Sequence, residues 1–318
     1  MTKEQSRSVQ LNLRSYAKIN LSLDVTGVRD DGYHLLETVM QQVSLYDDIG
    51  IRWEPDSCGE LKITVTNSKP YLPVDSRNLA YKAALVMAEQ AESLIGKRPR
   101  GVLKIHIEKR IPVAAGLGGG SGNAAAMVIG LNRLWEMKID TPGLCAIGTL
   151  LGADVPFCIL TQNSRYTCAL GTGIGEVLTP VKPGMKKHIV LAKPAFGVST
   201  KEVFREIDRF PSSERPDTQE LIKGLKQGDM DRVYPNMINI LENYTLKCYP
   251  EVQTLKDRMS AAGDAEKVLM SGSGTTVMAI YNNYGSARRA CLEIRRHGYE
   301  AYWAHTGKEI RGERNVKL

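Results

Sequence analysis

Cysteine is scarce in this sequence, and its few copies are far apart. The 318 residues contain six cysteines, and none of them form a Cys-x-x-Cys pair. Cysteines this scattered are typical neither of a disulfide framework nor of a zinc site. Several lie in apolar runs, and we expect buried thiols in a reducing compartment. The six are Cys58, Cys145, Cys158, Cys168, Cys248 and Cys291.

Long apolar runs are lacking as well. A transmembrane helix needs about 20 consecutive apolar residues, and no run of that length occurs. The first residues are polar and do not have the pattern of a signal peptide. We therefore expect no membrane interaction and a cytoplasmic location.

Aromatic residues make up only 6% of the chain, and four of them are phenylalanine. Single-stranded RNA is usually recognised by aromatic side chains set among basic ones, and no such patch is visible. The net charge of +7 is spread along the chain and suits polyanionic small molecules as well as nucleic acid. The sequence therefore favours a small-molecule ligand.

Glycine, by contrast, is concentrated in residues 111–126, which read IPVAAGLGGGSGNAAA. Before this stretch, Leu103, Ile105 and Ile107 alternate with polar residues and predict a half-buried strand. After it, apolar residues recur at helical spacing. Glycines let backbone amides approach a ligand, and the first turn of a helix has unpaired N–H groups. We therefore interpret the stretch as a phosphate-binding loop. A flexible loop without a ligand is the alternative.

This loop fits neither of the common phosphate-binding motifs. A Walker A loop ends in Gly-Lys-Ser/Thr, and no such sequence follows Gly120. The dinucleotide-binding fingerprint needs an acidic residue at the end of the next strand, and no clear candidate stands at the expected distance.

Residues 9–25 form a long alternation of apolar and polar side chains. A period of two predicts a strand with its odd positions buried. Lys18 and Asn20 fall on the opposite face, and periodicity alone favours a solvated face for them. Tyr33 and His34 follow the turn that ends this strand. Taken alone, an aromatic residue beside a histidine at a turn is ordinary packing.

Shorter apolar runs predict the other elements of the first half. Runs at 39–45, 49–53 and 61–65 predict strands of a mixed sheet, and Asp75 or Ser76 is predicted to cap the helix that follows. Beyond residue 175 a helix-rich stretch is followed by strands around the sequence SGSG. Since this α+β pattern differs from that of the first half, we place a boundary near Met185. The predicted domains are residues 1–185 and 186–318.

Asp154 is a lone carboxylate among apolar residues, in the sequence GADVPF. It follows a helix predicted to begin at Thr141 and to end at Gly152. Carboxylates are rarely buried without a partner. Two interpretations stay open from the residues alone: a loop aspartate that bonds nearby amides, or a base in a cleft.

Five separated motifs resemble those of one family. AKINLSLDV, DGYH, the glycine loop, GADVPF and MSGSGTTV follow one another in this order. The loop, with its proline ahead of Gly-Leu-Gly-Gly-Gly-Ser, resembles the ATP loop of the GHMP small-molecule kinases. Together the motifs resemble the 4-diphosphocytidyl-2-C-methyl-D-erythritol kinases, GHMP kinases of the non-mevalonate isoprenoid pathway. The resemblance spans roughly residues 11–281.

The resemblance implies a two-domain α+β GHMP kinase fold. The N-terminal domain would resemble domain 2 of ribosomal protein S5 and bind ATP, and the C-terminal domain would be ferredoxin-like. Another GHMP kinase, acting on a sugar, homoserine or mevalonate, is one alternative. A non-catalytic ligand-binding or RNA-binding protein on the same scaffold is the other.

The resemblance also implies roles for residues that the patterns left open. Lys18 and Asp154 would form the catalytic pair, and Asn20 would contact the substrate. Tyr33 and His34 would hold the cytosine. Phe204 is a weaker match, because it rests only on its place after a turn in the second domain. The ATP-binding residues would be Pro112, Val113, Ala114, Ala115, Gly116, Leu117, Gly118, Gly119, Gly120, Ser121 and Gly122.

The implied reaction transfers the γ-phosphoryl group of ATP to the 2-hydroxyl of 4-diphosphocytidyl-2-C-methyl-D-erythritol. Asp154 would accept the hydroxyl proton. Mg²⁺ would be bound through the ATP phosphates, without a metal site made by the protein. The expected partner is this small cytidine diphosphate substrate, with no nucleic acid and no membrane, and the expected state is a monomer or weak homodimer.

Two positions depart from the family pattern. Gly122 stands where the family usually has a second serine, and Thr275 follows Gly274 where the family has proline or alanine. Restoring the hydroxyl by Gly122→Ser is expected to preserve or tighten ATP binding, unless the backbone at Gly122 has a positive φ.

Overall fold

The computed structural model describes residues 8–56, 59–182 and 186–308. The chain divides into two compact units, each assembled from separate stretches of sequence. The first comprises Met1–Tyr16, Tyr46–Ile111 and Gly119–Arg165, and the second Ala17–Leu45, Pro112–Gly118 and Tyr166–Leu318. Cys58 and the predicted boundary at residue 185 lie outside the described residues, so the division at residue 185 stays a prediction.

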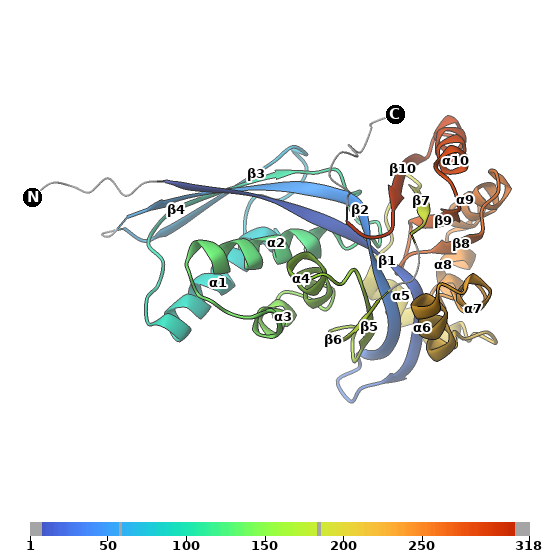
Figure 1. Cartoon of the computed structure of the whole chain (residues 1–318), viewed down its shortest axis with the longest axis horizontal. Coiled ribbons are helices and arrows are strands. Elements are labelled where there is room, and N and C mark those ends of the chain that lie inside the picture. The colour runs from blue at the N-terminus through green and yellow to red at the C-terminus, as the bar shows by residue number, and fades with distance from the viewer. Residues whose placement is uncertain (1–7, 57–58, 183–185, 309–318) are drawn as a thin grey trace, which may run out of the picture. The chain divides into compact units, whose positions relative to one another are not determined.

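Two long neighbouring strands open the described chain, β1 (Val9–Val28) and β2 (His34–Pro55) (Figure 1). The strand predicted at 9–25 is confirmed. The runs at 39–45 and 49–53 are not separate strands, because β2 continues through both. The turn between β1 and β2 contains Gly32 with φ +82°, a conformation that favours glycine.

The sheet of the first unit is built around β4 (Gly101–Glu108). This strand pairs in parallel with β3 (Leu61–Asn67) and antiparallel with the last part of β2, from Asp48 opposite Glu108 to Pro55 opposite Gly101. Its apolar side chains are buried and those between them are exposed, which confirms the half-buried strand.

Helices of the first unit pack beside this sheet (Figure 1). The second of them contacts both the first and the fourth, and its middle is buried. The predicted cap of the first helix was wrong: Asn78 caps it, while the Asp75 carboxylate accepts from the Arg77 amide in the preceding turn. The fourth helix was not predicted, because its short apolar run has no clear period. The helices are α1 (Leu79–Ile95), α2 (Gly119–Leu134), α3 (Thr141–Thr149) and α4 (Val155–Asn163).

The second unit contains an antiparallel sheet of order β10-β7-β9-β8. Side chains of β7 and β9 form a buried core with α9 (Pro250–Ala261), α10 (Tyr284–Arg296) and other helices. A further hairpin pairs with the first part of β2. The strands are β5 (Cys168–Thr172), β6 (Val177–Val181), β7 (His188–Lys193), β8 (Lys267–Met270), β9 (Val277–Tyr281) and β10 (Glu300–His305).

Two helices of the second unit begin at residues whose side chains cap them. Ser199 accepts from the Glu202 amide, and Asp217 accepts from the Gln219 and Glu220 amides. The helices are α5 (Thr200–Glu206), the 3₁₀ helix η1 (Ile207–Arg209), α6 (Thr218–Gln227), α7 (Met230–Val233), α8 (Glu242–Cys248), α9 (Pro250–Ala261) and α10 (Tyr284–Arg296).

Candidate functional site

Lys18 and Asn20 are buried in the second unit, so the solvated face that periodicity favoured was wrong. Their exposed fractions are 5% and 2%, because β1 is buried on both faces over residues 17–24. The Lys18 ammonium donates to Asn20 Oδ1 at 2.9 Å. Asn20 Nδ2 donates in turn to Thr38 Oγ1 at 2.8 Å, and that hydroxyl donates to the Ser22 carbonyl. This chain of bonds fixes the Asn20 amide with its oxygen toward Lys18.

The glycine loop lies against Lys18 within the second unit. The Lys18 amide donates to the Leu117 carbonyl at 3.0 Å. A Cβ atom on Gly118 would lie 2.8 Å from Lys18 Cγ, and Gly118 has φ +64°. Only glycine allows this approach between the loop and the lysine side chain.

The turn after β8 contacts both of these segments. Ser271 Oγ donates to the Gly116 carbonyl at 3.3 Å and lies 3.4 Å from the Asn20 amide nitrogen, which donates to it. A Cβ atom on Gly116 would lie 2.4 Å from the Ser271 carbonyl oxygen. The second unit thus brings three of the five sequence motifs together: AKIN, the glycine loop and MSGSG.

His34 is the centre of a second group in this unit. Its ring lies 5.6 Å from that of Phe204, centroid to centroid, and its Nε2 lies 3.2 Å from Asp208 Oδ1. Phe204, on α5, also packs against the core of the unit. Tyr33, beside His34, is 61% exposed. A carboxylate on Nε2 favours the tautomer with its proton there, which leaves Nδ1 as an acceptor.

The end of the glycine loop enters α2 in the first unit. Gly119 is the first residue of this helix, and Gly120 and Ser121 follow in its first turn. Gly120 is exposed, and Gly119 and Ser121 are half-buried. The first amides of a helix have no intrahelical partner and carry the positive end of its dipole. This turn can therefore bind an anion, which agrees with the phosphate interpretation.

Gly122→Ser is expected to destabilise the protein by about 1–3 kcal/mol, the usual cost of overpacking. The backbone at Gly122 is not left-handed, but a Cβ atom there would lie 2.6 Å from Ser15 Oγ and 3.0 Å from the Tyr16 carbonyl oxygen. A serine side chain at position 122 must push β1 away at Ser15 and Tyr16, so ATP binding should weaken. Urea unfolding measures the cost. Gly120→Ser is the control, because its nearest neighbour would be Leu79 Cδ1 at 3.4 Å. Equal stability of the two variants would contradict the clash.

Asp154 lies directly before α4 in the first unit, where it is half-buried. Its side chain does not accept a capping hydrogen bond from the helix. The loop aspartate that bonds nearby amides and the base in a cleft both stay predictions. The preceding helix, α3, ends at Thr149. The end predicted at Gly152 was therefore wrong.

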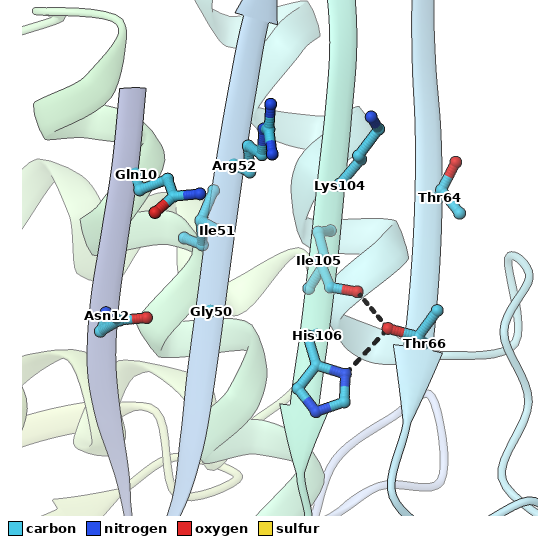
Figure 2. A pocket seen from close by; sticks show the side chains of 10 residues that line it. All are labelled: Gln10, Asn12, Gly50, Ile51, Arg52, Thr64, Thr66, Lys104, Ile105 and His106. Carbon is cyan, nitrogen blue, oxygen red and sulfur yellow. Dashed lines mark hydrogen bonds between the residues drawn. The ribbon is translucent and has the colours of Figure 1, made fainter. Parts of the chain in front are cut away.

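A cavity of about 350 Å³ lies on the strands of the first unit (Figure 2). Arg52 and Lys104 extend from this face, and both pair with Glu54. No predicted site residue lines it. In the described parts of the chain, no three His, Cys, Asp or Glu side chains form a group that could hold a metal ion. None of the helices described is both long and apolar enough to cross a bilayer.

Sequence reasoning missed Asp208 and Thr38, which bond predicted site residues, and Asp47, a buried carboxylate in β2. Asp208 and Thr38 bond His34 and Asn20 from distant positions, and no local pattern marks them. Asp47 had a signal similar to that of Asp154, since it follows an apolar run within a strand.

Two sequence families match this chain. The family described as GHMP kinases N terminal domain matches residues 78–162, and that described as GHMP kinases C terminal matches residues 221–300. The 4-diphosphocytidyl-2-C-methyl-D-erythritol kinase of Alkaliphilus metalliredigens (strain QYMF) is 44% identical over 281 residues, 88% of this chain and 91% of that protein. The kinase of the same name from Alkaliphilus oremlandii (strain OhILAs) is 42% identical over 305 residues, 95% of this chain and 99% of that protein.

Solved structures agree with these matches. The crystal structure of a 4-(cytidine 5'-diphospho)-2C-methyl-D-erythritol kinase has a TM-score of 0.74 and 32% identity, and the match covers 94% of this chain and all of that one. The homoserine kinase from Cytophaga hutchinsonii ATCC 33406 has a TM-score of 0.67 at 16% identity, covering 97% and 96%, which shows a shared fold alone. The predicted two-domain α+β fold is confirmed.

Proposed function

Because this chain belongs to the 4-diphosphocytidyl-2-C-methyl-D-erythritol kinase family of GHMP kinases, we propose that it transfers the γ-phosphoryl group of ATP to the 2-hydroxyl of 4-diphosphocytidyl-2-C-methyl-D-erythritol. The observation that carries this proposal is the buried Lys18, which Asn20 orients and the glycine loop contacts. A buried ammonium held by a fixed acceptor beside a phosphate loop suits phosphoryl transfer, which depends on alignment and charge stabilisation.

The glycine loop would bind the phosphates of ATP. Its amides and the first turn of α2 supply donors, and the helix dipole favours the negative charge. When bound together with ATP, Mg²⁺ would offset the negative charge of the phosphates. The Ser121 hydroxyl is the side-chain oxygen that this turn offers to the metal or to a phosphate.

Lys18 and Asp154 would act on the acceptor hydroxyl. Asp154 would accept its proton, and the Lys18 ammonium would stabilise the developing negative charge on the oxygen. Asn20, whose two ends bond Lys18 and Thr38, would position that ammonium. A direct contact of Asn20 with the substrate stays a prediction.

The group around His34 would select the base. Tyr33 would stack on the cytosine, and Phe204 beside His34 would pack against it. The Nδ1 lone pair of His34 would accept a hydrogen bond from the amino group of cytosine. Uracil has a carbonyl oxygen at that position and would leave Nδ1 without a donor, so this site would reject it.

Tyr33→Ala is expected to raise KM for the cytidine substrate by roughly tenfold, since stacking on an aromatic ring contributes about 1–3 kcal/mol per base. KM for ATP should change little. Tyr71→Ala is a matched control, because Tyr71 is similarly exposed at 69% and belongs to the first unit. Steady-state kinetics with each substrate varied in turn decides the matter. If only the KM for ATP rose, Tyr33 would lie in the ATP-binding part of the site, and our assignment of the ATP-binding and cytidine-binding parts would be reversed.

Asp208→Asn is expected to reduce the preference for cytosine over uracil. An asparagine amide can present either an acceptor or a donor to Nε2, so the His34 tautomer is no longer fixed. The ratio of the kcat/KM value for the cytidine form of the substrate to that for the uridine form should fall by roughly tenfold. A change of this size corresponds to the loss of one polar contact. Asp231→Asn, an exposed change on α7, is the control. An unchanged ratio would exclude Asp208 from base selection.

Other features of the proposal follow from the family. We assign ATP binding to residues 1–185 and the C-terminal GHMP kinase domain to residues 186–318. We propose a cytoplasmic enzyme that uses Mg²⁺-ATP, takes a small-molecule substrate and does not bind nucleic acid. We also propose that it is a monomer or a weak homodimer.

A panel of acceptors tests the proposal. ATP consumption is measured with 4-diphosphocytidyl-2-C-methyl-D-erythritol, homoserine and mevalonate in separate reactions, and without an acceptor. We expect turnover with the cytidine substrate only. Turnover with homoserine or mevalonate would assign another GHMP kinase activity, and no turnover with any acceptor would favour a non-catalytic protein.

A further inference from the structure

Asp47 is a fully buried carboxylate in the first unit, outside all five sequence motifs. It lies in β2, and both of its oxygens accept hydrogen bonds. Oδ1 accepts from the backbone N–H groups of Arg110 at 2.7 Å and Ile111 at 2.8 Å, and Oδ2 accepts from Lys109 Nζ at 2.5 Å. These three donors lead directly into the glycine loop.

The same carboxylate reaches the residues that follow the loop. Three acceptors surround the side-chain amide of Asn123 in α2, so its nitrogen faces them: Asp47 Oδ2 at 3.0 Å, the Gly119 carbonyl at 3.1 Å and Ser15 Oγ at 2.8 Å. Asp47 therefore bonds both segments that flank the loop and, through Asn123, the strand β1.

The flanking segments are also packed tightly against each other. A Cβ atom on Gly119 would lie 2.7 Å from Lys109 Nζ and 3.1 Å from Ile111 Cγ2. Burial lowers the pKa of the Lys109 ammonium, and the attraction of Asp47 opposes that shift. Without Asp47, a buried charge would lie unpaired beneath the first residue of α2, and such a charge is unfavourable.

We propose that Asp47 is a positioning residue for the phosphate loop. It clamps residues 109–111 to residues 119–123, so the loop enters and leaves at a fixed spacing and its amides keep the geometry that phosphate needs. Asp47 acts through the loop and does not touch a substrate. This proposal rests on the proposed function, because it assumes that the loop binds ATP.

Asp47→Asn tests the clamp. It keeps the size of the side chain but removes the charge that holds Lys109. The Kd for a non-hydrolysable ATP analogue, measured by calorimetry, should rise roughly tenfold to hundredfold, since small displacements of a binding loop can have effects of that size. KM for the cytidine substrate should change less than twofold, and amide hydrogen exchange over residues 112–122 should become faster.

Asp48→Asn is the matched control. Asp48 is the next residue, is half-exposed, and pairs with the Arg110 side chain at 2.6 Å. The variant removes the same charge beside the same loop without opening the buried network, so neither Kd nor hydrogen exchange should change.

Asn123→Ala is a second test if Asp47→Asn does not fold. It leaves the Asp47–Lys109 pair intact and removes the bonds to Gly119 and Ser15, so the analogue should bind more weakly while the protein stays folded. If folded Asp47→Asn or Asn123→Ala binds the analogue like the wild type, Asp47 is only structural and the proposal is wrong. If the wild type does not bind the analogue, the proposed function fails as well, so the two failures are distinguishable.

Discussion

Asp154→Asn is expected to lower kcat by roughly a hundredfold to ten-thousandfold, the contribution of a positioned general base. Asparagine keeps the shape of the side chain but cannot accept a proton from the acceptor hydroxyl. Because the Asp154 side chain does not cap α4, the helix should begin as before. The circular dichroism spectrum and the Kd for an ATP analogue should therefore match those of the wild type.

Asp140→Asn is the control for this substitution. Asp140 caps α3 in the same unit by accepting from the Gly143 amide, and asparagine caps helices about equally well. Its kcat should be unchanged. A kcat near the wild-type value in Asp154→Asn would show that the base is assigned wrongly. A loss of folding in this variant would instead give Asp154 a structural role.

Gly116→Ala is expected to abolish detectable ATP binding. Gly116 has φ +70°, and a Cβ atom there would lie 2.4 Å from the Ser271 carbonyl oxygen and 3.1 Å from the Gly274 carbonyl oxygen. Both contacts are with backbone, which cannot rotate away, so the loop or the turn after β8 must move. Calorimetry with an ATP analogue measures the loss, and urea unfolding measures the effect on stability.

Gly96→Ala separates the backbone strain from the clash. Gly96 ends α1 with φ +65°, and a Cβ atom there would meet nothing within 4 Å. This variant should lose about 1 kcal/mol of stability from the left-handed backbone alone. ATP binding should be unchanged. If Gly116→Ala were no more harmful than Gly96→Ala, the loop would not be held against Ser271.

The periodicity of the sequence predicted the elements that alternate cleanly between two environments. β4 is an example, and so is the strand-loop-helix order around the glycines. Periodicity failed where both faces of an element are buried. Lys18 and Asn20 lie on the polar side of β1, yet hydrogen bonds to one another and to Thr38 allow them to be buried there. The two-residue period of a strand does not reveal such hydrogen bonds.

The remaining features that the sequence did not predict depend on contacts between residues far apart in the chain. Asp208 bonds His34 across 174 residues, and Asp47 bonds Lys109 across 62. Neither pair has a local spacing that could reveal it. The catalytic and base-binding residues were instead named through family motifs, and the network beneath the loop was found only from the folded chain.

Identification of the reaction product tests the central claim most directly. ATP and 4-diphosphocytidyl-2-C-methyl-D-erythritol are incubated with the wild-type protein, and the product is analysed by ³¹P NMR spectroscopy. We predict one new phosphomonoester signal that is not split by a proton, because carbon 2 of the erythritol carries none, together with one equivalent of ADP. Release of inorganic phosphate without a phosphorylated erythritol, or a phosphate at another hydroxyl, would contradict the claim.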